Sequence, residues 1–198
     1  MEDVADTARQ TGNGRGAENL TREDWIAAAW EMLGESGVEG VRVEPLAKKL
    51  GVTKGSFYWH FKGRQDLLDS LLDRWFAIWD ERTLSDVQAA ASPADKIWGL
   101  FRSVIGRASR GQTVSLRIWS HRNPEIARRI DERDTERLAF LMEHLQSIGY
   151  SAAEARVRGQ IYQAIMTGEY LRSGGLPMSE RLERARQYHE MLSRQPDG

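Results

Sequence analysis

Basic side chains concentrate in one short stretch of the sequence, between Arg42 and Arg64. The chain of 198 residues has a formal net charge of −1, yet this stretch contains a single acidic residue, Glu44. Its basic residues are Arg42, Lys48, Lys49, Lys54, Lys62 and Arg64. A local excess of positive charge in a nearly neutral chain favours binding to a polyanion, while an ordinary solvated surface is the structural alternative.

Within this stretch, the residues after Thr53 have types and spacing that suit contact with nucleic acid. A spacing of four places Phe57 and Phe61 on one face of a short helix. The two phenylalanines are expected to anchor the helix on the core and to leave its other face free. That face contains Lys54, Gly55, Tyr58 and Trp59. A helix N-terminus with a lysine binds phosphate, and exposed aromatic rings can contact thymine methyl groups or sugars.

The sequence contains no recognisable catalytic or metal-binding constellation. It has no cysteine, which excludes a thiolate nucleophile and the common Cys-ligated zinc sites. It also has no glycine-rich phosphate loop and no nucleophile elbow. His121 and Glu125 are four residues apart, but Pro124 lies between them and no third ligand is indicated. We therefore expect no enzyme activity, no catalytic residue, no metal and no cofactor.

The elements that must position these side chains are predicted to be helices throughout. Hydrophobic residues recur at helical spacing, and no segment shows a sustained alternation of period two. The predicted helices run from Thr21 to Gly37, Glu44 to Leu50, Thr53 to His60, Gln65 to Arg82, Pro93 to Gly111, Val114 to Trp119, Pro124 to Ile148, Ser151 to Leu171 and Pro177 to Leu192. With 40% hydrophobic and 29% charged residues, the composition fits a folded all-α chain.

The run from Val43 to Lys62, followed by Asp66-Leu67-Leu68, resembles the helix-turn-helix of the TetR family of bacterial transcriptional regulators. The block from Lys54 to Lys62 is the most specific part of this resemblance. Pro45 departs from the family pattern, although it fits the first turn of a helix. Residues 1–19 are polar and Gly-rich without an apolar period, which predicts a flexible tail. The resemblance implies a three-helix DNA-binding domain at 20–80 and a larger helical domain at 81–198 that dimerises and binds a small effector.

The resemblance also implies roles for individual residues. Lys62 matches a phosphate-contacting lysine, and His60 and Tyr58 match contacts to phosphate or to a base edge. We expect base readout from Lys54, Gly55 and Tyr58. The full predicted DNA-binding set is Arg42, Thr53, Lys54, Gly55, Ser56, Tyr58, Trp59, His60 and Lys62. The expected partner is double-stranded DNA that carries a palindromic operator.

Aromatic residues beyond the helix-turn-helix have two interpretations. They can form a solid core, or they can line an apolar cavity in which a few polar groups orient an effector. The predicted pocket residues are Trp75, Trp79, Trp98, Phe101, Arg117, Trp119, His121 and Phe140.

The segment from Ser151 to Leu171 has more apolar surface than one packing face requires, which favours a subunit interface. Together with the last helix and the same two helices of a second copy, it would form a four-helix contact about a two-fold axis. The predicted interface residues are Gly159, Tyr162, Ile165, Met166 and Tyr188.

The resemblance implies a homodimeric, ligand-responsive repressor that is released from its operator by a small molecule. An effector-independent DNA-binding protein is the first alternative, and a helical small-molecule-binding protein or enzyme is the second. The acidic start of the sequence and the absence of a long apolar run predict a cytoplasmic protein without a membrane segment.

Overall fold

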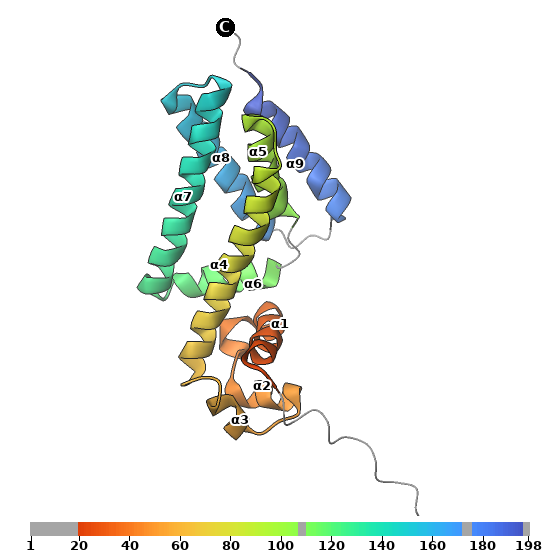
Figure 1. Ribbon diagram of the computed structural model, residues 1–198, viewed down its shortest axis with the longest axis vertical. Helices are drawn as coiled ribbons and strands as arrows, with labels where there is room; N and C mark the ends of the chain where they lie inside the picture. Colours follow the sequence, from red (N-terminus) through yellow and green to blue (C-terminus); the bar gives the residue numbers. More distant parts are fainter. Residues whose placement is uncertain (1–19, 107–109, 172–175, 196–198) are drawn as a thin grey trace, which may run out of the picture.

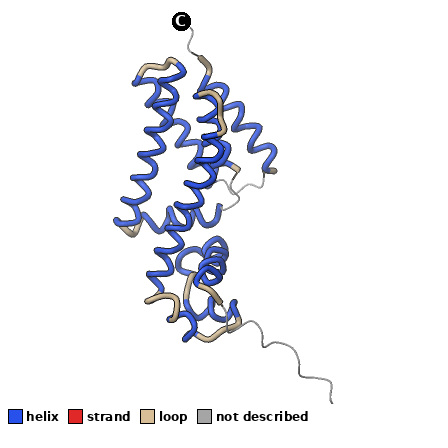
Figure 2. The backbone as a smooth tube through the Cα atoms, in the orientation of Figure 1, coloured by secondary structure: helices blue, strands red, loops and turns tan. Residues whose placement is uncertain are grey.

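The computed structural model describes residues 20–106, 110–171 and 176–195, and leaves the side chains at 78–86, 88 and 110 outside the description. Within these ranges the chain forms nine helices and no strand, which confirms the all-α prediction (Figure 2). The predicted tail, residues 1–19, lies outside the described residues. None of the described helices combines the length and the apolar character needed to cross a membrane.

Three helices form one end of the molecule: α1 (Arg22–Gly40), α2 (Val43–Leu50) and α3 (Lys54–Tyr58) (Figure 1). Thr21 caps α1 in a reciprocal arrangement with Asp24, because its hydroxyl accepts the Asp24 N–H while the Asp24 carboxylate accepts the Thr21 N–H. Gly37 has a φ of 68°, and α1 bends there before its last residues. The predicted helix end at Gly37 is therefore a kink.

The remaining helices form a bundle above this end (Figure 1). They are α4 (Arg64–Gln88), α5 (Pro93–Ile105), α6 (Arg110–Ser120), α7 (Pro124–Ile148), α8 (Ala152–Leu171) and α9 (Met178–Ser193). The long helix α4 connects the three-helix end to the bundle and continues past position 80. It extends beyond the predicted end at Arg82 because no breaker precedes Ser92-Pro93.

Helix α6 crosses the base of the bundle and packs on α1 (Figure 1). Gln112 donates from Nε2 to the Trp30 carbonyl oxygen at 3.1 Å. Ser115 donates to the Leu33 carbonyl oxygen at 3.0 Å. A Cβ atom at Gly111 would lie 2.4 Å from the Gly34 carbonyl oxygen, so the two backbones meet in a contact that only glycine permits. The three-helix end is thus held to the bundle through α6 as well as through α4.

The inner face of α8 packs inside the chain and corrects part of the predicted dimer interface. Tyr162 is fully buried, and its ring lies 5.1 Å from that of Phe101 on α5. A Cβ atom at Gly159 would lie 2.8 Å from Leu138 Cδ1 on α7, and Met166 is also buried. The prediction that these three α8 residues face a partner is therefore wrong. Periodicity revealed an apolar helix, but α8 has two apolar faces and these residues lie on the inner one.

Candidate nucleic-acid interface

A tight left-handed turn fixes the angle between α2 and α3. Gly51 adopts φ 71° and ψ 26° and ends α2. The Val52 N–H then donates to the Ala47 carbonyl oxygen at 3.0 Å and closes the turn. A residue with a Cβ atom would pay about 1–2 kcal/mol for this backbone conformation. The glycine at this position thus gives the two helices their helix-turn-helix arrangement.

Buried aromatic rings anchor α3. Phe57 and Phe61 stack with ring centroids 5.1 Å apart, and both are buried. The rings of Trp25 on α1 and Phe57 meet edge to face, with centroids 5.4 Å apart. This contact holds the short helix against the three-helix core, as the four-residue spacing predicted. The opposite face of α3 is therefore left at the surface.

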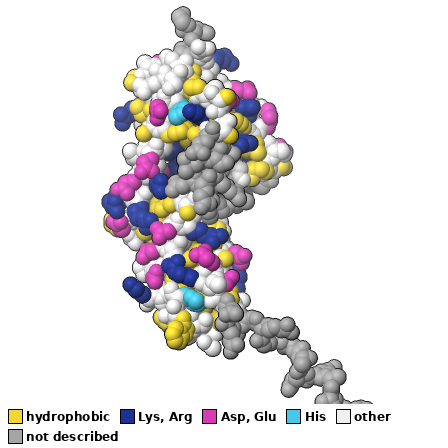
Figure 3. Space-filling model, viewed as in Figure 1, with side chains coloured by type: hydrophobic (Ala, Val, Ile, Leu, Met, Phe, Trp, Pro, Cys, Tyr) yellow, Lys and Arg dark blue, Asp and Glu magenta, His cyan; other side chains and the backbone are white. Residues whose placement is uncertain are grey.

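Tyr58 and Trp59 leave two large rings in solvent. Tyr58 is 63% exposed and Trp59 is 88% exposed, directly after the fully buried Phe57. Figure 3 shows hydrophobic side chains at the surface of this end of the molecule. At this exposure Trp59 does not pack against α1 or α4. Large exposed apolar side chains side by side are typical of a contact surface.

Two of the basic residues from the sequence stretch support the fold. Arg64 donates from Nε to the Val41 carbonyl oxygen at 2.7 Å and from Nη2 to the Val38 carbonyl oxygen at 2.5 Å. Lys49 forms an ion pair with Glu31 at 3.0 Å. Their positive charge therefore contributes less to an external anion than the sequence count suggests.

Three of the remaining basic residues, Arg42, Lys48 and Lys54, line a groove between α2 and α3, and Lys62 follows α3 in the chain. Arg42, Lys48 and Lys62 are exposed, and no ion pair is recorded for them in the described part of the chain. Lys54 forms an ion pair with Glu44, the one acidic residue of the basic stretch. The groove is lined by Arg42, Val43, Glu44, Pro45, Lys48, Lys54 and Tyr58. Glu44 is ten residues from Lys54, so only the folded turn places it in the site.

The other predicted DNA-binding residues lie on or directly after α3. Thr53 occupies the N-cap position, but its hydroxyl makes no capping hydrogen bond and stays exposed. Gly55 is exposed, while Ser56 and His60 are partly exposed. The Lys62 N–H donates to Asp66 Oδ2 at 2.9 Å, which fixes the backbone and leaves the Lys62 side chain in solvent. The predicted set thus gathers at one end of the molecule.

The predicted effector residues are spread over several helices. Trp98 and Phe101 on α5 contact each other, with ring centroids 6.4 Å apart. Trp75 is buried and donates from Nε1 to Thr113 Oγ1 at 3.1 Å. Of the others, Trp119 and Phe140 are partly buried and His121 is exposed. The side chain of Trp79 lies outside the described residues.

Arg117 joins α6 to α7. It donates from both terminal nitrogens to the two carboxylate oxygens of Asp134, each at 3.1 Å. Arg137 donates to the same carboxylate at 2.6 Å. Because two guanidinium groups share one acceptor, Arg117 is already engaged within the chain. Its Nε atom is buried and has no hydrogen-bond partner among the described residues.

A buried polar pair lies between α8 and α9. The Tyr162 hydroxyl lies 2.9 Å from His189 Nδ1, and the Trp98 ring lies 5.4 Å from the His189 ring. Burial, with a smaller contribution from the nearby Arg186, lowers the pKa of His189 to about 4, while Asp95 acts in the opposite direction. Burial also raises the pKa of Tyr162. At neutral pH both groups are uncharged and belong to the core.

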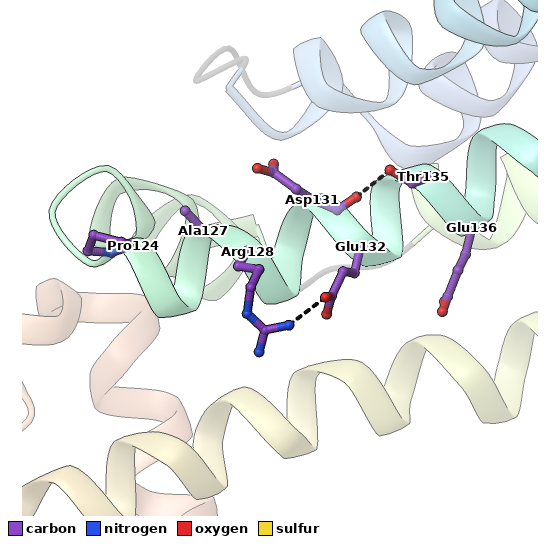
Figure 4. Close-up of a pocket in the computed structure, with 7 residues that line it drawn as sticks. All are labelled: Pro124, Ala127, Arg128, Asp131, Glu132, Thr135 and Glu136. Atoms are coloured by element: carbon purple, nitrogen blue, oxygen red, sulfur yellow. Dashed lines mark hydrogen bonds and ion pairs between the residues drawn. The ribbon is translucent and has the colours of Figure 1, made fainter.

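A surface hollow along α7, between Pro124 and Glu136, is lined by side chains of that helix (Figure 4). Arg128 donates to Glu132 at 2.5 Å and to Glu125 at 2.6 Å. The hydrogen bond from Arg128 lowers the pKa of Glu125. These contacts join residues one helical turn apart, so they stabilise α7 itself.

The fold and the groove together define an all-helical protein with a helix-turn-helix end. Residues 26–71 match the family described as bacterial regulatory proteins, tetR family. This match contains α2, the Gly51 turn and α3. Residues 26–71 therefore form a domain of the kind found in the tetR family of bacterial regulatory proteins.

Individual relatives agree with this assignment. Tetracycline repressor protein class D of Escherichia coli is 46% identical over 52 residues, which cover 26% of this chain and 24% of that protein. The class A protein from transposon 1721 of Escherichia coli is 32% identical over 158 residues, which cover 76% of this chain and 63% of that protein. The chain spans about a quarter of the length of the class C, D and H repressors that it matches.

A solved structure extends the likeness in fold to the bundle. AibR, in complex with isovaleryl coenzyme A and operator DNA, superposes with a TM-score of 0.69 at 20% identity. The superposition covers 86% of this chain and 97% of AibR. Most of the chain therefore shares its fold with a protein of known structure.

Proposed function

We propose that the chain is a DNA-binding transcriptional regulator that acts as a homodimer on a palindromic operator. The observation that carries this proposal is the free face of α3, where Tyr58 and Trp59 are exposed beside Lys54 while Phe57 anchors the helix. The side chains of Arg42, Lys48 and Lys62, which are exposed and have no ion pair within the described residues, supply positive charge for phosphates around this face. The tetR family match over residues 26–71 supports the same function.

The dimer is proposed to form through the outer faces of α8 and α9. Val157 is 56% exposed and Ile161 39% exposed, and Leu171 continues the same apolar face of α8. On α9, Met191 is exposed and Tyr188 is partly exposed. Ile165 is partly exposed and stays a predicted interface residue. Two copies paired here could present two α3 helices about one DNA turn, ~34 Å, apart.

We further propose that a small molecule bound in the bundle releases the DNA. Support comes from the fold shared with AibR, which has been solved with isovaleryl coenzyme A and operator DNA. The contacts of α6 with both α1 and α7 offer a physical path, because a shift of α6 would move the helix-turn-helix end. The aromatic residues Trp75, Trp98 and Phe101 lie in the bundle from which this shift would start.

The experiment that tests the proposal is selection from a random duplex-DNA pool by the purified full-length chain, followed by a salt titration. Enrichment of a palindrome, bound with a steep salt dependence, is the expected result. Failure to enrich any sequence would overturn the repressor proposal. A thermal-shift screen of small molecules, with isovaleryl coenzyme A as one probe, then tests the effector. If no compound stabilises the protein and weakens DNA binding, the effector-independent alternative is preferred.

A further inference from the structure

The ion pair between Glu44 and Lys54 places opposite charges side by side in the α2–α3 groove. Glu44 lies in the first turn of α2 and Lys54 begins α3. The Glu44 side chain is 68% exposed and that of Lys54 is 56% exposed. Both groups can therefore meet a molecule that enters the groove.

Protein stability gives little reason for this pair. An exposed ion pair contributes about 0–1 kcal/mol, and α2 is already held to the core by the buried Leu46 and Ala47. A carboxylate in the first turn of α2 does favour the helix dipole. That effect would act equally well on a side chain that points away from α3, so it does not account for the pairing with Lys54.

On a DNA-binding surface, an isolated carboxylate is unfavourable. Arg42 and Lys48 flank Glu44 in the groove and are positioned to attract phosphates, which repel a negative side chain. The repulsion is offset only where the carboxylate accepts a hydrogen bond from a base. In the major groove the base donors are the N4 amino group of cytosine and the N6 amino group of adenine.

Lys54, the ion-pair partner of Glu44, distinguishes between cytosine and adenine as the base that donates to Glu44. A lysine pairs best with guanine, because O6 and N7 are adjacent acceptors on one base. The G·C pair presents these acceptors beside the cytosine N4 donor. In an A·T pair the donor lies between two acceptors on different bases, so a lysine meets a single acceptor. The adjacent charges of Lys54 and Glu44 therefore match the edge of one G·C pair.

We propose that Glu44 is a specificity-determining residue and that it reads, together with Lys54, one G·C base pair in each operator half-site. Lys54 donates to guanine, and Glu44 accepts from cytosine N4. On DNA without this pair, Glu44 repels the backbone and holds Lys54 away from phosphates. The inference rests on the proposed DNA-binding function and adds a residue and a base identity to it.

The test compares duplex-DNA selections by the wild-type chain, Glu44→Ala, Glu44→Gln, Lys54→Ala and the control Glu31→Gln. The control removes a carboxylate from a similar exposed pair, Glu31 with Lys49, that lies outside the groove. We expect the Glu44 variants and Lys54→Ala to lose discrimination at the same base pair by about tenfold, with preferences elsewhere retained. We expect Glu31→Gln to keep the wild-type motif.

Binding to random duplex DNA supplies a second readout. Removing Glu44 frees Lys54 for a phosphate, so Glu44→Ala should bind random DNA more tightly and steepen the salt slope by about 1 per protomer. Unchanged base preference in both Glu44 variants would overturn the inference, as would a change at a different base pair from that altered by Lys54→Ala. If Glu31→Gln also lost discrimination at this base pair, the loss in the Glu44 variants would come from the change in net charge alone. That result would overturn the inference. A wild-type chain that enriches no motif would instead overturn the proposed function.

Discussion

The free face of α3 and the free face of α8 both expose apolar side chains, but the sequence defines only the first one clearly. In α3, a buried ring and an exposed ring are neighbours in the chain, Phe57 and Tyr58. In α8, an exposed residue and a buried residue are also neighbours, Ile161 and Tyr162. Helix α3 has five residues and one anchoring face, whereas α8 has twenty residues and two apolar faces. A short motif can therefore specify its own orientation, while a long apolar helix takes its orientation from the helices around it.

The largest effect should come from the anchor of α3. Phe57→Ala removes a fully buried ring that contacts Trp25 and Phe61. We expect a loss of about 3–5 kcal/mol in the free energy of unfolding, measured by urea denaturation. Tyr58→Ala is the matched control, since it truncates the exposed neighbouring ring. It should lose no more than about 1.5 kcal/mol, because its ring makes one edge-to-face contact with Phe57, and it should weaken operator binding. Equal losses of stability in the two variants would contradict the division between anchor and contact surface.

The second prediction concerns a substitution on the outer face of α8. Ile161→Asp places a charge on the face proposed to pair with a second copy, where Val157 is also exposed. The dimer should dissociate with a constant at least about a hundredfold higher, equal to about 2.7 kcal/mol, in analytical ultracentrifugation. The control is Ile118→Asp on α6, an exposed isoleucine outside the α8 and α9 faces. If Ile118→Asp dissociated the protein and Ile161→Asp did not, the interface would lie elsewhere.

The third prediction concerns the joint between the two regions. In Gly111→Ala, the added methyl group would lie 2.4 Å from the Gly34 carbonyl oxygen, so α6 must move away from α1. We expect a loss of about 1–3 kcal/mol in the free energy of unfolding. Gly63→Ala is the control, because no atom lies within 4 Å of the added methyl group. Wild-type stability and DNA affinity in Gly111→Ala would show that the contact between α1 and α6 is not tight in solution.

The difference between these regions explains what could be predicted from the sequence. The Gly51 turn and the burial of Phe57 and Phe61 followed from local spacing, and the structure has them as predicted. The burial of Tyr162 did not follow, because it depends on Phe101, which lies sixty-one positions earlier in the chain.

The groove residue Glu44 was missed for a related reason. A charge count shows that an acidic residue is present, but not that the turn brings it to Lys54. Folding also determines which basic residues remain free to bind DNA. Arg64 donates hydrogen bonds to the carbonyl oxygens of Val38 and Val41, and no periodicity in the sequence indicates that contact.

The smallest predicted effect is a pH dependence that arises in the bundle and not in the helix-turn-helix end. Burial lowers the pKa of His189 to about 4, whereas an exposed histidine titrates near 6.5. As the pH falls below about 6.5, the unfolded chain binds a proton that the folded chain excludes, so folding stability decreases until about pH 4. Above pH 6.5 this contribution is fully present. We expect a loss on the order of 1–2 kcal/mol across the interval, in addition to the effects of the carboxylates.

Urea denaturation at several pH values, with wild type and His189→Gln, separates this contribution from the others. Glutamine keeps a polar group near the Tyr162 hydroxyl but cannot titrate, so the variant should be less stable at pH 7 and should lose less stability between pH 6.5 and pH 4. The carboxylates are the same in both chains, and their contribution cancels in the difference. Parallel curves for the two proteins would mean that His189 takes up its proton without unfolding. The packing of α9 on Trp98 and Tyr162 would then be loose enough to admit a charge, and the bundle would be the softer of the two regions.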